Sequence, residues 1–301
     1  MKHSIVILIA YFGQWPIWIN FFIETCRSNK DIDWIIFSDC GPIENSAQNV
    51  KVIDISFDNY KKLVAETLRI NFNPPEPYKI CDIRPAFGAI HNDLIKGYDF
   101  IGFGDLDVFY GQIRNFYDYE VLSNYSVLSS HPERVSGHFF LMRNMPRLIK
   151  AFERVPNWKD CFSKKEHIGF DENHFTIALL DMKGSRYLMW KKNNNRLLFQ
   201  ERYSSPGPTK SMKWFWKDGI LSNEFYCFVN PREHRGFLYL HFMDWFNNRW
   251  YAYHNYVCEG AKAPWQGIEN IIKLDWRRTR DEGFMVSPEG ISPIVWPAYC
   301  T

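Results

Sequence analysis

The stretch Asp99-Phe100-Ile101-Gly102-Phe103-Gly104-Asp105-Leu106-Asp107 is the part of the chain that indicates its fold class. Residues 100–104 carry no charged side chain, which is typical of a strand covered on both faces of a parallel sheet. Asp105 and Asp107 follow directly where that strand ends. Because ligands of open α/β sheets bind beyond the carboxyl ends of the strands, the stretch predicts an acidic site at the edge of the sheet.

Upstream of this stretch, apolar runs alternate with a segment that suits a helix. We expect strands at 4–10, 34–37 and 50–53 and a helix at 17–27. Each of the first two runs ends in polar residues or glycine. Alternation of this kind predicts an α/β fold with a mostly parallel, Rossmann-type sheet flanked by helices.

Further regular elements are expected as far as about residue 193. Apolar spacing predicts helices at 60–72, 86–96, 144–155 and 171–182 and strands at 125–129 and 138–142. Beyond them the chain becomes aromatic, basic and rich in loop residues, with no repeat and no clear linker. We therefore expect one large domain over 1–245 with an aromatic-rich C-terminal extension over 246–301 packed on it.

The charge balance argues against a nucleic-acid partner. The 301 residues include 36 Lys plus Arg and 34 Asp plus Glu, a formal net charge of +2. Proteins that bind nucleic acid through its phosphates usually carry a strongly basic face, and this composition has no excess from which to build one.

Cysteine usage and the N-terminal sequence favour a cytoplasmic protein. The seven cysteines are scattered without a C-x-x-C pair, so neither a disulfide framework nor a zinc ribbon fits. Residues 4–10 resemble the apolar part of a signal peptide, yet no small-x-small cleavage site follows and Gln14, Pro16 and Asn20 interrupt the run. We interpret it as a buried strand.

The aromatic content of 18% is unusually high. Rings such as Phe87, Phe100 and Phe103 lie in apolar patterns that a core explains. From Trp214 onward, rings occur among Arg and Asn residues, a pattern that we interpret as a surface for sugars rather than core. The tryptophans of this group are Trp214, Trp216, Trp245, Trp250 and Trp265.

The pair Asp105-x-Asp107 suits a divalent cation. Two carboxylates at a strand end can share one hard cation, and Mg²⁺ or Mn²⁺ held in this way usually takes its remaining ligands from water and substrate phosphates. The pair by itself is a weak signal, because short acidic triplets are common on exposed loops. Its position at the end of a buried strand favours a metal site.

The segment before this strand strengthens that interpretation. The segment begins with Lys79-Ile80-Cys81-Asp82-Ile83-Arg84-Pro85 and continues through a helix and the strand to Asp105-Leu106-Asp107. As a whole it resembles the sugar-nucleotide-binding region of GT-A glycosyltransferases. The similarity is to bacterial capsule and lipopolysaccharide enzymes with a K-x-x-D-x-x-R helix before a D-x-D strand. It covers residues 79–110 well and the first 40 residues loosely. Where that family often has Gly-Gly before the strand, this chain has Lys96-Gly97-Tyr98.

The resemblance implies a GT-A-like fold and roles for individual residues. It implies that the D-x-D pair holds the metal and the donor diphosphate, and that the preceding helix contacts the donor sugar or phosphates. It also implies that residues at the ends of the first two strands bind the base and ribose. The residues that would contact the donor are Tyr11, Phe12, Asp39, Lys79, Asp82, Arg84 and Asp105. Two alternatives remain open. Tyr11 and Phe12 could instead pack in the core, and Asp82 and Arg84 could instead form an ion pair at the start of the helix.

A late histidine is the expected third metal ligand beside Asp105 and Asp107. His241 ends the apolar run Phe237-Leu238-Tyr239-Leu240 and resembles the histidine that completes many GT-A metal sites, with His234 as the second choice. A buried core histidine is the alternative.

The acceptor side is expected to carry an acidic pair. Asp171 and Glu172 open an amphipathic helix, where a helix cap is the simpler explanation. The resemblance implies instead that the pair deprotonates the acceptor hydroxyl or orients the sugar. It also implies that Gly137-His138-Phe139-Phe140 lines the floor between donor and acceptor.

Taken together, these features predict a metal-dependent hexosyltransferase. It would use Mn²⁺ or Mg²⁺ and a nucleotide-sugar donor, with a UDP-hexose favoured, and a hydroxyl of a glycan or lipid-linked glycan as acceptor in bacterial cell-surface polysaccharide synthesis. Residues 265–280 offer a peripheral contact with the inner face of the cell membrane or a solvated face. A metal-dependent phosphohydrolase or nuclease and a non-catalytic carbohydrate-binding protein remain alternatives.

Overall fold

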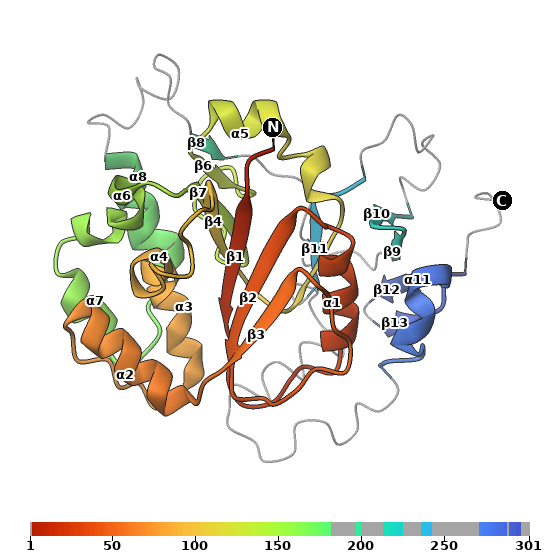
Figure 1. Cartoon of the computed structure of the whole chain (residues 1–301), viewed down its shortest axis with the longest axis horizontal. Coiled ribbons are helices and arrows are strands. Elements are labelled where there is room, and N and C mark those ends of the chain that lie inside the picture. Colours follow the sequence, from red (N-terminus) through yellow and green to blue (C-terminus); the bar gives the residue numbers. More distant parts are fainter. Residues whose placement is uncertain are drawn as a thin grey trace.

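The computed structural model describes residues 2–181, 197–199, 213–224, 236–242, 271–287 and 289–295. Its centre is a seven-stranded sheet in the order β3-β2-β1-β4-β7-β6-β8 (Figure 1). The strands are β1 (Ile5–Ala10), β2 (Ile32–Ser38), β3 (Val50–Asp54), β4 (Phe100–Gly104), β6 (Val127–Ser129), β7 (Phe139–Arg143) and β8 (Leu197–Phe199).

The sheet is mostly parallel, as the sequence predicts. Strands β1, β2, β3 and β4 run parallel to one another, and β6 runs parallel to β8. Strand β7 is antiparallel to both of its neighbours, β4 and β6. The predicted α/β class, with a mostly parallel sheet flanked by helices, is confirmed.

Helices cover both faces of this sheet. On one side, left in Figure 1, lie α2 (Phe57–Leu68), α3 (Ile80–Ile83), α4 (Phe87–Ile90), α6 (Pro146–Ile149), α7 (Trp158–Ser163) and α8 (Phe175–Asp181), and on the other lies α1 (Ile19–Arg27). Successive residues of β1 divide between two cores. Ile5, Ile7 and Ile9 belong to the core under α1, and Val6 and Leu8 belong to the core under α2. Side chains alternate across a strand, so burial on both faces requires the continuous apolar run seen in the sequence.

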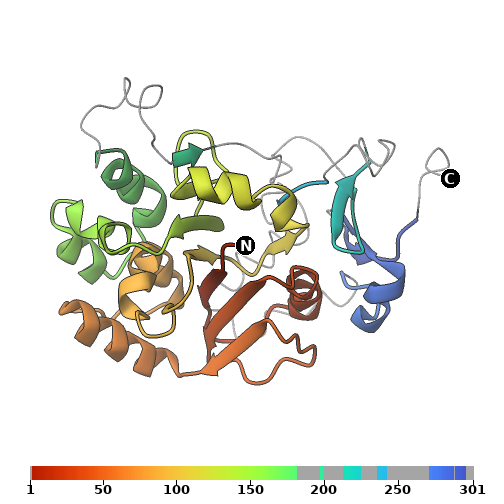
Figure 2. The same cartoon turned by 45° about the horizontal axis from the view of Figure 1, so that its top comes forward.

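Two smaller sheets extend the core under α1. Strands β5 (Val108–Tyr110) and β11 (Tyr239–His241) pair antiparallel, and β9 (Trp214–Lys217), β10 (Ile220–Asn223), β12 (Phe284–Ser287) and β13 (Gly290–Ser292) form a four-stranded sheet. Figures 1 and 2 place the four-stranded sheet and α11 (Thr279–Glu282) beside α1. The remaining described α-helix is α5 (Tyr119–Asn124).

The tryptophans of β9 correct one prediction. Trp214 and Trp216 are 1% and 3% exposed and pack in the core under α1, so they are not the predicted sugar-binding surface. Phe215, which lies between them, is 1% exposed as well. Strand β9 is therefore buried on both faces, between β10 and β12, and local composition does not reveal this tertiary covering. Trp245, Trp250 and Trp265 lie outside the described residues.

Several predicted helices have different lengths. The helix expected at 86–96 ends at Ile90, because His91 leaves the helical conformation and its ring stacks on Phe37 with centroids 3.9 Å apart. The segment expected at 144–155 divides into α6 and a 3-10 turn, Ala151–Arg154. Helix α2 begins earlier than expected, because the Ser56 hydroxyl accepts a hydrogen bond from the backbone N–H of Asn59 and caps it.

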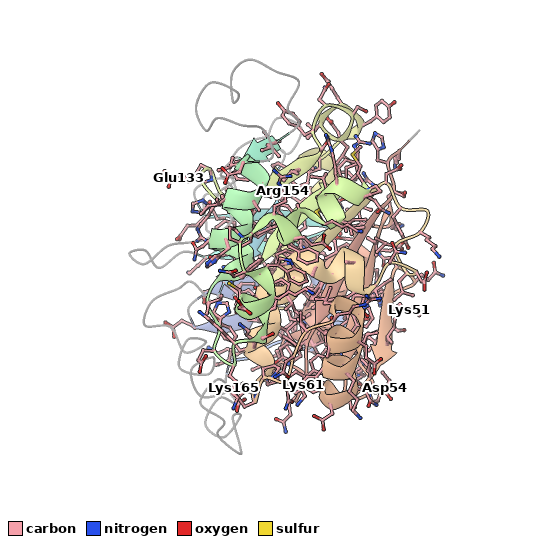
Figure 3. The ribbon with its side chains drawn as sticks, turned by 90° about the vertical axis from the view of Figure 1, so that its left-hand side faces the viewer. Lys51, Asp54, Lys61, Glu133, Arg154 and Lys165 are labelled. Atoms are coloured by element: carbon pink, nitrogen blue, oxygen red, sulfur yellow. The ribbon has the colours of Figure 1, made fainter. Side chains whose placement is uncertain are left out.

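The outer surface is polar. Exposed charged side chains such as Lys51, Asp54 and Lys165 lie at the periphery in Figure 3. Among the described helices, none combines the length and the apolar composition that crossing a membrane would need.

Four cysteines in the described ranges, Cys26, Cys40, Cys81 and Cys161, are free thiols. The predicted division at residue 245 falls within a segment outside these ranges.

Candidate active site at the carboxyl edge of the sheet

The loops after β1 and β2 meet at the carboxyl edge of the sheet. The Asp39 carboxylate accepts hydrogen bonds from the backbone N–H groups of Gly13 at 2.8 Å and Phe57 at 3.1 Å. It therefore ties the loop after β1 to the start of α2. Tyr11 is partly buried and stacks on Trp15, with ring centroids 5.9 Å apart.

Phe12, from the same loop, faces the other way. It is 7% exposed and packs on Phe57 and Tyr60 in the core under α2. Of the two rings predicted to contact the donor, Tyr11 lies at the edge of the sheet, whereas Phe12 has the core position that was the alternative.

Asp105, Asp107 and His241 converge beyond the carboxyl end of β4. Each offers one ligand atom, and these atoms all lie within 4.8 Å of one another. The Nε2 atom of His241 lies 3.2 Å from the Oδ2 atom of Asp107. All three side chains are partly exposed. The three residues predicted as metal ligands therefore form one group.

Strand pairing brings His241 to this group. Strand β11 pairs antiparallel with β5 so that His241 faces Val108, the residue that follows Asp107. The backbone N–H of Phe242 donates to the carbonyl oxygen of Asp107 at 3.2 Å, and the N–H of Asp105 donates to the carbonyl oxygen of His138 at 3.2 Å. His234, the second choice, lies outside the described residues.

The donor set fits a divalent cation such as Mn²⁺. Two carboxylates and an imidazole in reach of one another combine hard oxygen ligands with a nitrogen ligand that Mn²⁺ accepts. The pKa of Asp105 is raised to about 6, because burial and the nearby Asp107 carboxylate together outweigh the lowering effect of the Arg84 guanidinium. Carboxylates that repel each other in a partly buried position gain from a cation between them.

Arg84 links this group to the predicted acidic pair. Its guanidinium forms an ion pair with the Asp105 carboxylate and donates to Asp171 Oδ2 at 3.2 Å and to the Gly137 carbonyl oxygen at 3.0 Å. The side chain is only 11% exposed. Burial by itself would lower the pKa of Arg84. The nearby carboxylates of Asp105, Asp171 and Asp107 have the larger effect together and raise its pKa.

The two carboxylates of the acidic pair have different surroundings. The Asp171 side chain is 3% exposed, whereas the Glu172 side chain is 32% exposed and forms an ion pair with Arg134. Glu172 Oε1 also accepts the N–H of Gly137 at 3.2 Å. Burial raises the pKa of Asp171 to about 6, although Arg84 lowers it. Glu172 is therefore the more accessible acid of the pair.

Lys79 and Asp82 lie away from the metal group, in the helical layer. Lys79 Nζ donates to Asp82 Oδ2 at 2.8 Å and to the carbonyl oxygens of Cys161 and Glu166. Asp82 also accepts the backbone N–H groups of Ile168 at 2.9 Å and Phe170 at 2.7 Å. Both side chains are at most 1% exposed. This burial does not support their predicted contact with the donor; it gives them a role in holding the chain that leads to Asp171.

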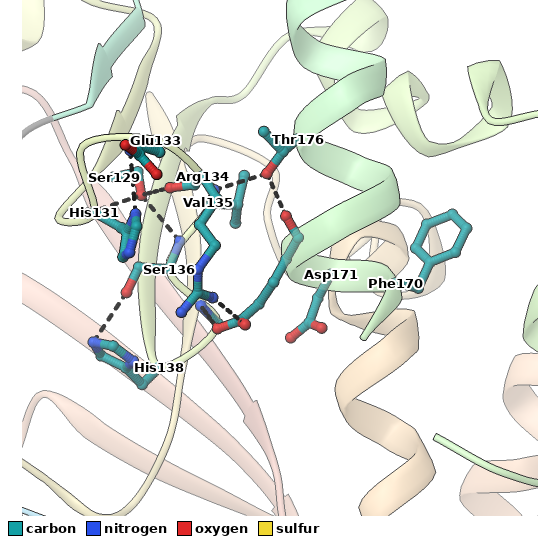
Figure 4. A network of polar contacts seen from close by, with 12 residues as sticks. Ser129, His131, Glu133, Arg134, Val135, Ser136, His138, Phe170, Asp171 and Thr176 are labelled. Atoms are coloured by element: carbon teal, nitrogen blue, oxygen red, sulfur yellow. Dashed lines mark hydrogen bonds and ion pairs between the residues drawn. The ribbon is translucent and has the colours of Figure 1, made fainter. Parts of the chain in front are cut away.

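The sequence did not predict the contacts that the loop between β6 and β7 makes at the site. Figure 4 shows Arg134, Ser136 and His138 of this loop reaching toward the acidic helix and toward the sheet edge. The His138 ring stacks on His241, with centroids 4.1 Å apart and planes 8° from parallel. His138 Nε2 lies 2.6 Å from the Tyr239 hydroxyl oxygen. Gly137-His138 beside an apolar strand was the available signal, and it indicated only the floor of a site.

The chain is similar to one protein family and to several solved structures. A family model described as a family of unknown function, DUF6625, matches residues 7–256. No curated protein matches the sequence. A galactosyltransferase LgtC in complex with donor and acceptor sugar analogs is 10% identical, with a TM-score of 0.34, and 64% of this chain and 86% of that chain are covered.

Two further solved structures are similar at the same level. The glycosyltransferase GlyE of Streptococcus pneumoniae is 11% identical with a TM-score of 0.34, covering 66% of this chain and 45% of that chain. Mouse xyloside xylosyltransferase 1 is 9% identical with a TM-score of 0.36, covering 79% of this chain and 97% of that chain. Identities this low do not identify a substrate or an activity. The match of the family model to most of the sequence shows that the chain belongs to the DUF6625 family.

Proposed function

We propose that the chain is a metal-dependent glycosyltransferase that moves a hexose from a nucleotide-diphosphate sugar to a hydroxyl of a glycan or lipid-linked glycan. A UDP-hexose is the favoured donor, and cell-surface polysaccharide synthesis is the favoured pathway. The observation that carries the proposal is the meeting of Asp105, Asp107 and His241 at the carboxyl edge of a mostly parallel sheet, next to Arg84 and the acidic pair.

The chain's own residues suit the charges of such a reaction. A divalent cation held by Asp105, Asp107 and His241 would neutralise the diphosphate leaving group. Arg84 is within hydrogen-bond distance of Asp105, and its guanidinium can donate to phosphate oxygens in a fork geometry. Fixed positive charge at the leaving group is the usual source of a large part of the rate enhancement.

The acceptor side is assigned to Glu172 and Asp171. Glu172 is one-third exposed, so an acceptor hydroxyl or a sugar can reach its carboxylate. Asp171 is buried against Arg84 and is proposed to orient that guanidinium rather than to meet the acceptor. Tyr11, partly buried beside Trp15, and Asp39 are proposed to hold the base and ribose.

A substitution at Asp107 tests the proposal. Asp107→Asn keeps the size of the side chain but removes one anionic ligand, so we expect Mn²⁺-dependent binding of UDP and release of nucleotide from UDP-hexoses to be lost. Asp93→Asn is the matched control, because Asp93 is 86% exposed and pairs with Lys96 on the surface. Binding is measured by calorimetry, and nucleotide release with a panel of sugar nucleotides with and without glycan acceptors.

Unchanged binding of UDP by Asp107→Asn would reject the proposal. If Asp107→Asn bound UDP as the parent does, with the same dependence on Mn²⁺, the cation site would be elsewhere. A parallel incubation with a generic phosphodiester identifies a phosphohydrolase, the alternative that a metal group at this edge also allows. Failure of Mn²⁺ and UDP to raise the melting temperature of the parent would point to a carbohydrate-binding protein without transferase activity.

A further inference from the structure

Arg84 occupies an unusual position between two groups of acids. Its guanidinium contacts Asp105, which is one of the three proposed cation ligands, and Asp171, which is the buried member of the acidic pair. It also donates to the carbonyl oxygen of Gly137 at 3.0 Å. The side chains of Arg84 and Asp171 are 11% and 3% exposed, so water does little to weaken these interactions.

The same carboxylate thus serves two cations. Asp105 is paired with a fixed guanidinium on one side and belongs to the proposed metal group on the other. A divalent cation that joins this group meets the positive charge of Arg84 and a carboxylate that Arg84 already neutralises. Both effects weaken cation binding.

We propose that Arg84 is a built-in counter-ion that holds the affinity for the divalent cation low until a nucleoside diphosphate binds. The diphosphate would take over the guanidinium hydrogen bonds now made to Asp105, which frees that carboxylate for the cation. Cation and nucleoside diphosphate therefore bind cooperatively, and each raises the affinity for the other by the same factor. The inference rests on the proposed cation site and adds a positioning role for Asp171, which shares Arg84 with Asp105.

Two substitutions should change cation affinity in opposite directions. Arg84→Gln removes the competing charge, so Mn²⁺ without nucleotide should bind on the order of tenfold tighter than to the parent. Asp171→Asn keeps the shape but removes the acid that draws Arg84 away from Asp105, so Mn²⁺ should bind more weakly. A general loss of structure would weaken binding in both variants.

The experiment is a Mn²⁺ titration of the full chain, followed by electron paramagnetic resonance, with and without UDP. Arg114→Gln is the matched control: Arg114 donates to the carbonyl oxygens of His3 and Asp31, near the amino ends of β1 and β2 and so at the opposite edge of the sheet. We expect UDP to strengthen Mn²⁺ binding to the parent and to Arg114→Gln by a larger factor than to Arg84→Gln, because only the coupling through direct phosphate coordination remains in Arg84→Gln.

The outcomes separate this inference from the proposed function. Suppose that Asp107→Asn loses Mn²⁺. If Arg84→Gln then binds Mn²⁺ no tighter than the parent, or is coupled to UDP as strongly as the parent, the counter-ion role is wrong and the cation site stands. If Asp107→Asn binds Mn²⁺ like the parent, the cation site is wrong and the inference fails with it. A weaker affinity for Arg84→Gln with unchanged melting temperature also overturns the counter-ion role.

Discussion

At the scale of single residues, Gly137 holds the two halves of the candidate site close together. A Cβ atom at this position would lie 2.9 Å from Asp171 Oδ2 and 3.0 Å from Glu172 Oε1. The backbone of Gly137 accepts from Arg84 and donates to Glu172. The absence of a side chain is thus what allows both acids to approach the loop that carries His138.

We expect Gly137→Ala to impair the reaction more than the fold. The added methyl group would displace the carboxylates by a few tenths of an ångström, and misplaced catalytic groups are costly, so kcat for sugar transfer should fall by at least about tenfold. Steady-state kinetics and a thermal melt check this. An unchanged kcat would show that the positions of Asp171 and Glu172 do not limit the rate.

The sequence could identify those site residues that lie directly after the end of a buried strand. Asp105 and Asp107 were predicted to share a site because both follow one buried strand, and they lie in one group with His241. His138 was predicted to line the floor of the site, but its stack on His241 was not, and Arg134 was not predicted, because these contacts cross between segments far apart in the chain. The inward direction of Phe12 likewise depends on packing that a one-dimensional pattern does not contain.

At the scale of elements, the buried pair Lys79–Asp82 anchors the segment that ends in the acidic pair. Asp82 accepts hydrogen bonds from Lys79, His167 and the backbone of Phe170, which is the first residue of the π-helical turn Phe170–His174. Burial alone would raise the pKa of Asp82, but these hydrogen bonds lower it to about 2. One carboxylate therefore ties α3 to the entrance of the helix that presents Asp171.

Removing one member of this pair should destabilise the protein strongly. Lys79→Met leaves the Asp82 carboxylate buried with less compensation, and breaking a buried pair typically costs about 3–5 kcal/mol in the free energy of unfolding. Lys96→Met, which breaks an exposed pair with Asp93, is the control and should change stability little. Urea unfolding of both variants measures the difference. Equal, small effects would show that the pair contributes no more than a surface pair.

Helix boundaries were predicted less well than the strands of the sheet. Strands β1, β2 and β4 match the apolar runs closely, because burial on both faces demands such runs. The helices expected at 86–96 and 144–155 are shorter or divided. Their apolar spacing is compatible with a longer helix, and the endings are set by tertiary contacts such as the stack of His91 on Phe37.

At the scale of the whole molecule, stability depends on keeping a histidine neutral inside the core. His91 is 4% exposed, stacks on Phe37 and lies 3.0 Å from the Tyr60 hydroxyl oxygen through its Nε2 atom. Burial lowers the pKa of His91 to about 3. In the unfolded chain the same group has a pKa near 6.5.

The sign of the resulting pH dependence follows from these two pKa values. Between about pH 6.5 and pH 3 the unfolded chain binds a proton that the folded chain does not, so the free energy of unfolding should fall by up to about 1.4 kcal/mol per pH unit as the pH drops through this window. His91→Gln should reduce this slope, even though it loses the ring stack at neutral pH. Urea unfolding across pH 4 to 7 tests it, and equal slopes would contradict it.

The sequence by itself determined the class of the fold and the place of the acidic site. Continuous apolar runs are needed wherever a strand is covered on both faces, and the residues that end those runs must lie at one edge of the sheet. The resemblance also indicated His241 and Arg84, but only the tertiary structure decided how distant groups complete the site. His241 reaches Asp107 through the pairing of β11 with β5, Arg84 bridges Asp105 and Asp171, and Lys79 and Asp82 turn inward. These outcomes depend on side-chain direction and on contacts between segments far apart in the chain, because burial and charge compensation are properties of the packed molecule rather than of any local stretch.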